Sequence, residues 1–141
     1  MNYRFYLLLF LFVISTAITI YISIRIREKY EEEDTMLIAL RNKLQPIFPD
    51  LNTVILLRGK KSYTINKKRV HLCLTDENGD YYDMNMLIYV LLHELAHVKC
   101  DEIGHTEKFH RIFNELLETA RKHGVYNPDI PIIRNYCEYK S

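Results

Sequence analysis

Two histidines in this chain are spaced to share one metal ion. His93 and His97 begin and end the run HELAH, residues 93–97. A helix turns once in about 3.6 residues, so on a helix both imidazoles project from the same face. Glu94 would point about 100° away around the helix, toward a water on the ion. The run therefore predicts a metal site with an acid–base group beside it. The plainer alternative is a helix that carries two surface histidines.

A catalytic zinc site needs a third protein ligand and an open position for water. We favour His105, which lies eight residues after His97 and follows a glycine, Gly104, that lets the backbone turn back. Imidazole ligands favour zinc (Zn2+) among the divalent ions. Four other side chains stay open as the third ligand: Cys100, His110, Glu115 and Glu118.

Two helices are predicted to carry these ligands. The apolar pattern from Asp83, a plausible N-cap, to about Lys99 is typical of a largely buried helix. A second amphipathic pattern runs from about Thr106 to His123, and Gly124 is placed to end it.

The region before these helices is predicted to form one more helix and a small sheet. Leucines at helical spacing indicate a helix over residues 28–45, which Pro46 ends. Short β-branched and aliphatic runs predict strands over residues 54–57, 63–65 and 70–74. With an irregular tail, this order predicts an α+β domain.

The N-terminus is predicted to be a transmembrane helix. Residues 5–24 contain no ionisable side chain except tyrosine. Twenty helical residues span the roughly 30 Å hydrocarbon core of a bilayer. A cleaved signal peptide, the alternative, would have a shorter apolar region and a small-residue cleavage site. We therefore predict an anchor over residues 1–27 and a second domain over residues 28–141.

The charges that flank the apolar segment predict its orientation. Arg4 precedes it, whereas Arg25, Arg27 and Lys29 follow it closely. Positive flanks stay on the cytoplasmic side of a membrane. The domain is therefore expected in the cytoplasm or in the equivalent interior of a virion.

The cysteines argue against a disulfide-stapled secreted fold. Cys73, Cys100 and Cys137 are odd in number, lie far apart and form no CxxC pair. We therefore expect a reducing location for the domain.

Composition excludes several classes of protein. The 141 residues are 48% hydrophobic and carry 19 Lys and Arg against 18 Asp and Glu. This excludes a disordered chain, an acidic tail protein and a broadly basic nucleic-acid binder. Six Lys and Arg do gather in residues 58–69. We favour solvated side chains there over contacts with nucleic-acid phosphates or lipid headgroups, so a nucleic-acid partner is allowed but not favoured.

The histidine segments resemble the WLM and SprT-like group of small zinc metalloproteases. In that group HExxH is followed by a third histidine and then by a phenylalanine, as in His105 and Phe109 here. The likeness covers about residues 50–125 and extends to short forms encoded by large DNA viruses. Seven residues separate His97 from His105, where many members have five. The resemblance implies a zincin-like fold and peptide-bond hydrolysis, in parts of the group on DNA-associated proteins.

Roles for individual residues follow from this resemblance. It implies zinc held by His93, His97 and His105, with Glu94 as general base. His71 and His123 are interpreted as structural or exposed. The sequence does not select the side chain that would stabilise the oxyanion among five tyrosines: Tyr81, Tyr82, Tyr126, Tyr136 and Tyr139.

We therefore predict a membrane-anchored zinc metalloprotease that acts on a protein or peptide substrate. The first alternative is a catalytically silent, membrane-tethered assembly protein, for example a virion component. The second is a protease that acts on DNA-associated proteins.

Overall fold

The structure, a computed structural model, describes residues 2–32 and 34–138. The chain divides into two compact units, Met1–Glu31 and Glu32–Ser141. The domain boundary that we predict after residue 27 stays a prediction.

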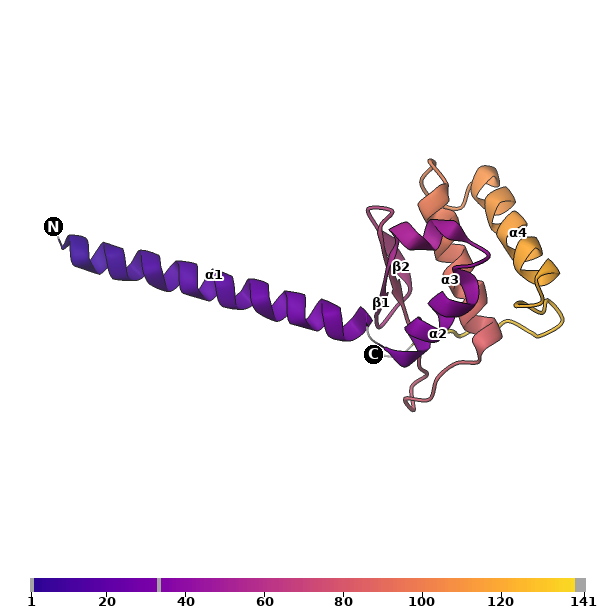
Figure 1. The fold of residues 1–141 in the computed structure, drawn as a ribbon, viewed down its shortest axis with the longest axis horizontal. Coiled ribbons are helices and arrows are strands. Elements are labelled where there is room, and N and C mark those ends of the chain that lie inside the picture. The colour runs from indigo at the N-terminus through magenta and orange to yellow at the C-terminus, as the bar shows by residue number, and fades with distance from the viewer. Residues whose placement is uncertain (1, 33, 139–141) are drawn as a thin grey trace. The chain divides into compact units, whose positions relative to one another are not determined.

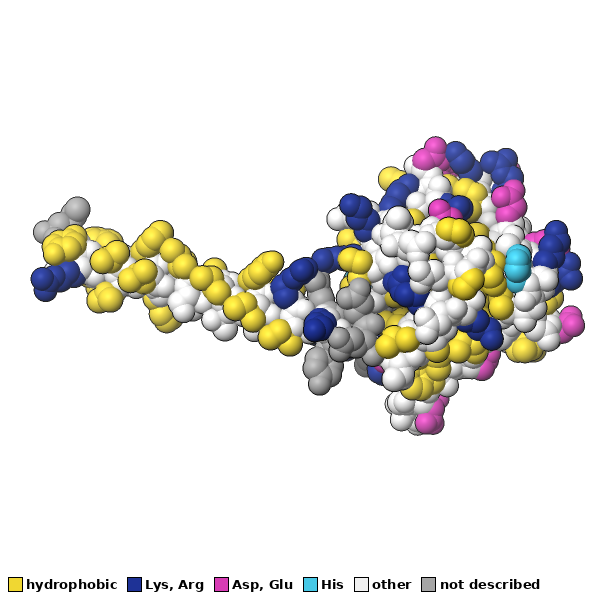
Figure 2. All heavy atoms as spheres, in the orientation of Figure 1, with side chains coloured by type: hydrophobic (Ala, Val, Ile, Leu, Met, Phe, Trp, Pro, Cys, Tyr) yellow, Lys and Arg dark blue, Asp and Glu magenta, His cyan; other side chains and the backbone are white. Residues whose placement is uncertain are grey.

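The first unit is a single helix, α1 (Tyr3–Glu32). Its segment Tyr3–Arg27 is long and apolar enough to cross a membrane, at about 37 Å for 25 residues. Figure 2 shows hydrophobic side chains along this helix, with Lys and Arg at both ends. Hydroxyls within the segment bond to backbone carbonyls one turn back, which lowers the cost of placing them in an apolar medium. These are Thr16 to Val13 (2.8 Å), Thr19 to Ser15 (2.9 Å) and Ser23 to Thr19 (2.8 Å).

The second unit combines helices with a three-stranded sheet, so the predicted α+β class is confirmed (Figure 1). Its elements follow the predicted order, with one added 3-10 helix before the sheet. They are α2 (Thr35–Leu44), η1 (Pro49–Thr53), β1 (Ile55–Arg58), β2 (Tyr63–Ile65), β3 (Arg69–Leu72), α3 (Met84–Lys99) and α4 (Glu107–Lys122).

The helix predicted over residues 28–45 is wrong at its start. The structure assigns residues 28–32 to α1 and begins α2 at Thr35. Asp34 separates the two, because its carboxylate accepts a hydrogen bond of 2.9 Å from the Met36 backbone N–H and so caps α2. The apolar face of α2 is then buried through Leu37, Leu40 and Leu44.

β3 is the central strand of the sheet. It pairs with β1 in parallel and with β2 in an antiparallel hairpin. Asn66 and Lys67 form the hairpin turn with φ of 51° and 54°, as a type I′ turn requires. The Lys67 ammonium donates to the Cys100 backbone carbonyl at the C-terminal end of α3. The hairpin is therefore tied to the helix that carries the HELAH run.

α3 is packed on two sides, against the sheet and against α4 (Figure 1). Asp83 caps it as predicted, accepting a 3.0 Å hydrogen bond from the Met86 backbone N–H. Leu91 and Leu95 have no exposed surface. Because close-packed interiors resist displacement, the backbone that carries His93 and His97 is held rigidly.

The structure joins Cys73 to Cys137 in a disulfide, which corrects the expectation drawn from the cysteine pattern. The two residues lie 64 positions apart, and the C-terminal tail returns to the end of β3 to bring them together. Spacing along the chain cannot show such a return. Cys100 remains a buried free thiol. The cysteines therefore no longer support a reducing location.

Candidate metal centre

The structure brings His93, His97 and His105 together into a group that could hold a metal ion. Their ligand atoms lie within 4.8 Å of one another. The Nε2 atom of His105 is 3.1 Å from that of His93 and 3.2 Å from that of His97. Tetrahedral zinc with bonds of about 2.0–2.1 Å sets its ligand nitrogens about 3.3–3.4 Å apart. Two of the three separations are thus close to those of a tetrahedral site, and the group could hold a metal ion.

The loop between α3 and α4 turns His105 back toward α3. Gly104 has φ of +84°, in the left-handed region that glycine adopts without strain. Thr106 then caps α4, and its hydroxyl accepts a 3.3 Å hydrogen bond from the Phe109 backbone N–H. An ion pair of 2.5 Å between Lys108 and Asp101 links α4 to the same loop.

None of the four alternative ligands joins the histidine group among the residues that the structure describes. Glu118 pairs instead with Arg121 at 2.6 Å, within α4. His110, Glu115 and Glu118 line a separate, shallow surface of α4. Cys100 is fully buried at the end of α3.

The Phe109 ring packs against all three imidazoles. It is fully buried, and its ring centroid lies 4.3 Å from that of His97 and 4.8 Å from that of His105. His93 lies 5.0 Å from Phe109 and 5.2 Å from Phe113. Packing of this kind restricts side-chain rotation, so the ligand nitrogens are held close to their binding geometry.

The electrostatics of the site favour the neutral form of His93 and His97. Burial, followed by the charges of neighbouring histidines, lowers the pKa of His93 from 6.5 to about 4. Burial and His105 also lower the pKa of His97. Neutral imidazole is the form that binds metal, and His93 and His97 are in that form at neutral pH. His97 lies in the last turn of α3, where the negative end of the helix dipole favours a bound cation.

Glu94 is a buried carboxylate beside this group, with 5% of its surface exposed. The Thr64 hydroxyl, in the middle of β2, donates a 2.7 Å hydrogen bond to its Oε2 atom. Burial raises the pKa of Glu94, and this hydrogen bond partly opposes the rise. Thr64 is absent from the sequence-based prediction, because only the packing of β2 on α3 brings it to Glu94.

His93 and Glu94 open onto a cavity of about 450 Å3. Its other lining residues come from the β1–β2 loop, α3 and the C-terminal tail. They are Lys61, Ser62, Val90, Tyr136, Cys137 and Glu138. A carboxylate and a metal-binding imidazole that face one cavity can act on a bound substrate.

Of the five candidate tyrosines, Tyr136 lines this cavity. Tyr82 packs against Tyr136 with ring centroids 4.9 Å apart. Tyr126 packs near Tyr89, and the Tyr81 hydroxyl lies 3.3 Å from the Asp34 carboxylate. Tyr139 lies outside the described residues.

His71, His123 and two residues of the basic stretch have structural contacts. His71 stacks on Tyr63 with ring centroids 4.5 Å apart, and His123 bonds to the Thr119 carbonyl at the end of α4. In the basic stretch, Arg58 pairs with Asp34 at 2.9 Å, in addition to the contact of Lys67 with α3. Part of the positive charge of residues 58–69 thus stabilises the fold.

The metal-free chain is expected to lose folding stability as the pH falls from 6.5 to about 4. In this range His93 is protonated in the unfolded chain but stays neutral in the folded chain. Acid therefore favours the unfolded chain. Glu94 acts in the opposite direction, because its raised pKa lets the folded chain bind a proton first. Thermal unfolding midpoints across this range test the prediction. His93→Gln should flatten the dependence and Glu94→Gln should steepen it. An unchanged slope in His93→Gln would contradict it.

Three viral proteins are similar to parts of this chain. Uncharacterized protein 136R of Invertebrate iridescent virus 6 is 55% identical over 85 residues, which cover 58% of this chain and 48% of that protein. Uncharacterized protein 042R of Invertebrate iridescent virus 3 is 47% identical over 87 residues, 61% of this chain and 55% of that protein. Uncharacterized protein R325 of Acanthamoeba polyphaga mimivirus is 43% identical over 67 residues, 46% of this chain and 34% of that protein.

The chain thus spans about half the length, or less, of these curated relatives. No family model matches it, and no solved structure matches it. The similarity to these proteins suggests a viral origin.

Proposed function

We propose that this chain is a membrane-anchored, zinc-dependent metallopeptidase of the WLM and SprT-like kind. One observation carries the proposal: three imidazoles lie within reach of a single ion, and one of them, His93, lines an open cavity together with the buried carboxylate of Glu94. A carboxylate in such a position costs stability, because burial disfavours its charged form. General-base chemistry accounts for that cost. A catalytically silent assembly protein, the alternative, would gain nothing from a buried carboxylate at this position.

His93, His97 and His105 would hold the zinc. When bound, zinc lowers the pKa of a water in its open position and polarises a substrate carbonyl. Glu94 accepts a proton and later donates it to the nitrogen of the leaving amine. Its raised pKa brings it nearer the working pH, as efficient proton transfer requires. Because Glu94 Oε2 accepts the hydrogen bond from Thr64, Glu94 Oε1 is the oxygen that accepts the proton.

The α1 helix is proposed as the membrane anchor. Its length and apolar surface suit a bilayer, and the excess of Lys and Arg after the segment favours the cytoplasmic side or a virion interior for the second unit. A disulfide persists where thiols are not kept reduced. Of these two locations, we therefore favour the virion interior over the free cytoplasm.

The proposed function is tested on the full chain in detergent micelles. We expect about one zinc per chain by elemental analysis, as three histidine ligands require. We also expect cleavage of an unfolded protein substrate that a chelator stops and added zinc restores. A folded chain that binds no zinc, or a zinc-loaded chain that cleaves no peptide bond, would overturn the proposal.

Thr64→Val is expected to lower kcat/KM by about 10–100-fold, the range for loss of a hydrogen bond to a charged group. Valine keeps the shape of threonine but cannot donate to Glu94 Oε2, so the carboxylate is no longer held. Thr64→Ser retains the hydroxyl and is the matched control. Peptide cleavage kinetics at constant zinc content measure the effect. Equal rates for Thr64→Val and wild type would show that Glu94 needs no such positioning.

A further inference from the structure

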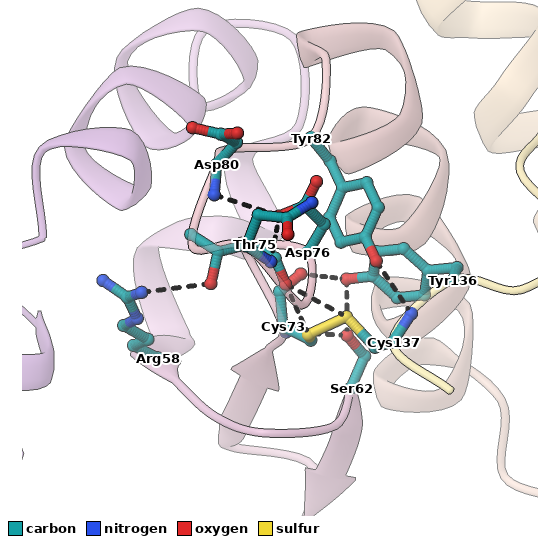
Figure 3. The surroundings of a disulfide bond; sticks show 10 residues. Arg58, Ser62, Cys73, Thr75, Asp76, Asp80, Tyr82, Tyr136 and Cys137 are labelled. Atoms are coloured by element: carbon teal, nitrogen blue, oxygen red, sulfur yellow. Dashed lines mark hydrogen bonds between the residues drawn. A yellow bond between two sulfur atoms is a disulfide. The ribbon is translucent and has the colours of Figure 1, made fainter. Parts of the chain in front are cut away.

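The C-terminal tail is held beside the proposed active site by a closed ring of hydrogen bonds. The Cys73 backbone N–H donates to the Ser62 hydroxyl at 3.0 Å, and that hydroxyl lies 2.9 Å from the Tyr136 hydroxyl. The Tyr136 hydroxyl in turn donates to the Cys73 carbonyl. Figure 3 shows these groups around the disulfide. Each hydroxyl in the ring is partnered, so Tyr136 has one defined position.

Cys137 is fixed next to Tyr136 in a conformation that its residue type disfavours. Its φ is 53°, in the left-handed region that costs free energy for residues other than glycine. Its backbone N–H donates to the Tyr82 hydroxyl at 3.1 Å, and its side chain forms the disulfide with Cys73 (Figure 3). Such a conformation persists only where surrounding contacts impose it. The covalent bond is the strongest of those contacts.

These contacts fix the position of tail residues that line the cavity. Tyr136, Cys137 and Glu138 share it with His93 and Glu94. Without the tail, the carboxylate and the imidazole would face open solvent on this side. The tail is therefore a wall of the cavity.

A second anchor lies at the start of the tail. The Asn85 side chain accepts from the Asn127 backbone N–H at 2.7 Å and donates to the Asn127 carbonyl at 3.0 Å. This pair ties the tail to α3 directly after α4. Loss of the disulfide would consequently loosen residues 128–138 and leave α4 and its contacts with the histidines in place.

We propose that the Cys73–Cys137 disulfide completes the substrate cleft, so that the peptidase binds its substrate at full strength only while this disulfide is intact. This inference rests on the proposed function. A dithiol reductant transfers two electrons and two protons to the cystine, giving two thiols on the protein and a disulfide on the reductant. The tail wall is then held only by its hydrogen bonds and by the packing of Tyr136 against Tyr82, so a substrate meets a less ordered binding surface. The enzyme is thereby most efficient in compartments that are not reducing.

The test compares the full-length chain in detergent before and after treatment with dithiothreitol. We expect amide hydrogen exchange in residues 135–138 to rise about tenfold or more on reduction, as for a segment that opens locally. Because dithiols also chelate zinc, the reductant is removed and zinc is restored before zinc content and kinetics are measured, and the zinc content should then equal that of the oxidised chain. KM for a peptide substrate should rise about fivefold or more, with a smaller change in kcat, as for loss of a binding surface.

Three variants separate the disulfide from other effects of reduction. The double variant Cys73→Ser/Cys137→Ser should have the raised KM from the outset and should not respond to dithiothreitol. Cys100→Ala removes the free thiol alone and should behave as wild type. Tyr136→Ala keeps the disulfide but removes part of the wall. It should raise KM without reduction, which keeps the inference testable if the double variant does not fold.

The outcomes distinguish this inference from the proposed function. Equal KM and kcat for the oxidised and reduced chains would overturn the inference while the peptidase function stands. Unchanged exchange in residues 135–138 would overturn it too, since the disulfide would not be what holds the wall. A zinc-loaded chain that cleaves no peptide in either state overturns the proposed function and, with it, the inference.

Discussion

Glu94→Gln is expected to abolish peptide hydrolysis while zinc stays bound. Glutamine has nearly the same shape as glutamate, and its amide oxygen can still accept the hydrogen bond from Thr64. It cannot accept a proton at neutral pH, so the general base is lost. Such a loss lowers the rate by about 10²–10⁴-fold. The histidine group is untouched, so the zinc content should equal that of wild type.

Cleavage rates and elemental zinc analysis, made on the same preparation, measure this effect. Glu115→Gln is the matched control, because Glu115 is exposed on α4 and lines a different surface. It should retain both zinc and activity, and it also tests Glu115 as the alternative ligand. Substantial activity in Glu94→Gln would refute Glu94 as general base. Loss of zinc in that variant would instead assign Glu94 to the metal.

His105→Ala is expected to remove the metal. Two histidines that remain on one helix are one ligand short of a catalytic zinc site. We therefore expect the zinc content of purified protein to fall from about one per chain to below about a tenth, with activity lost in parallel. His105 is exposed, so its replacement should disturb the fold less than a change at the buried Glu94.

His110→Ala is the matched control for this variant. The His110 ring centroid lies 6.3 Å from that of His105, and His110 stands outside the three-histidine group. Its zinc content should match that of wild type. The ligand assignment is wrong if His105→Ala retains a full complement of zinc, or if His110→Ala loses it.

The sequence alone determined the features that depend on neighbouring residues. Asp83 and Thr106 begin their helices as N-caps, and Gly124 follows α4 with φ of +67°. The HELAH run places His93 and His97 on one helical face, and Gly104 turns the backbone before His105. Caps, turns and helical faces act over one or two turns of chain, so residue types at fixed spacing predict them.

The sequence favoured His105 as the third ligand but left four other side chains open, and it selected none of the five tyrosines. The choice depends on how α4 packs on α3 and on where the tail returns. Packing places His105 against the other two histidines and directs Glu115 and Glu118 elsewhere. It also brings Tyr136 to the cavity.

The tertiary structure alone decided the contacts between distant segments. Thr64 reaches Glu94 across 30 positions, and Cys73 reaches Cys137 across 64. Neither pair has a signal in residue type or spacing, because each partner is ordinary for its own element. What joins them is the burial of apolar faces of the sheet, α3 and α4, a force without direction that selects one arrangement only when the whole core is packed.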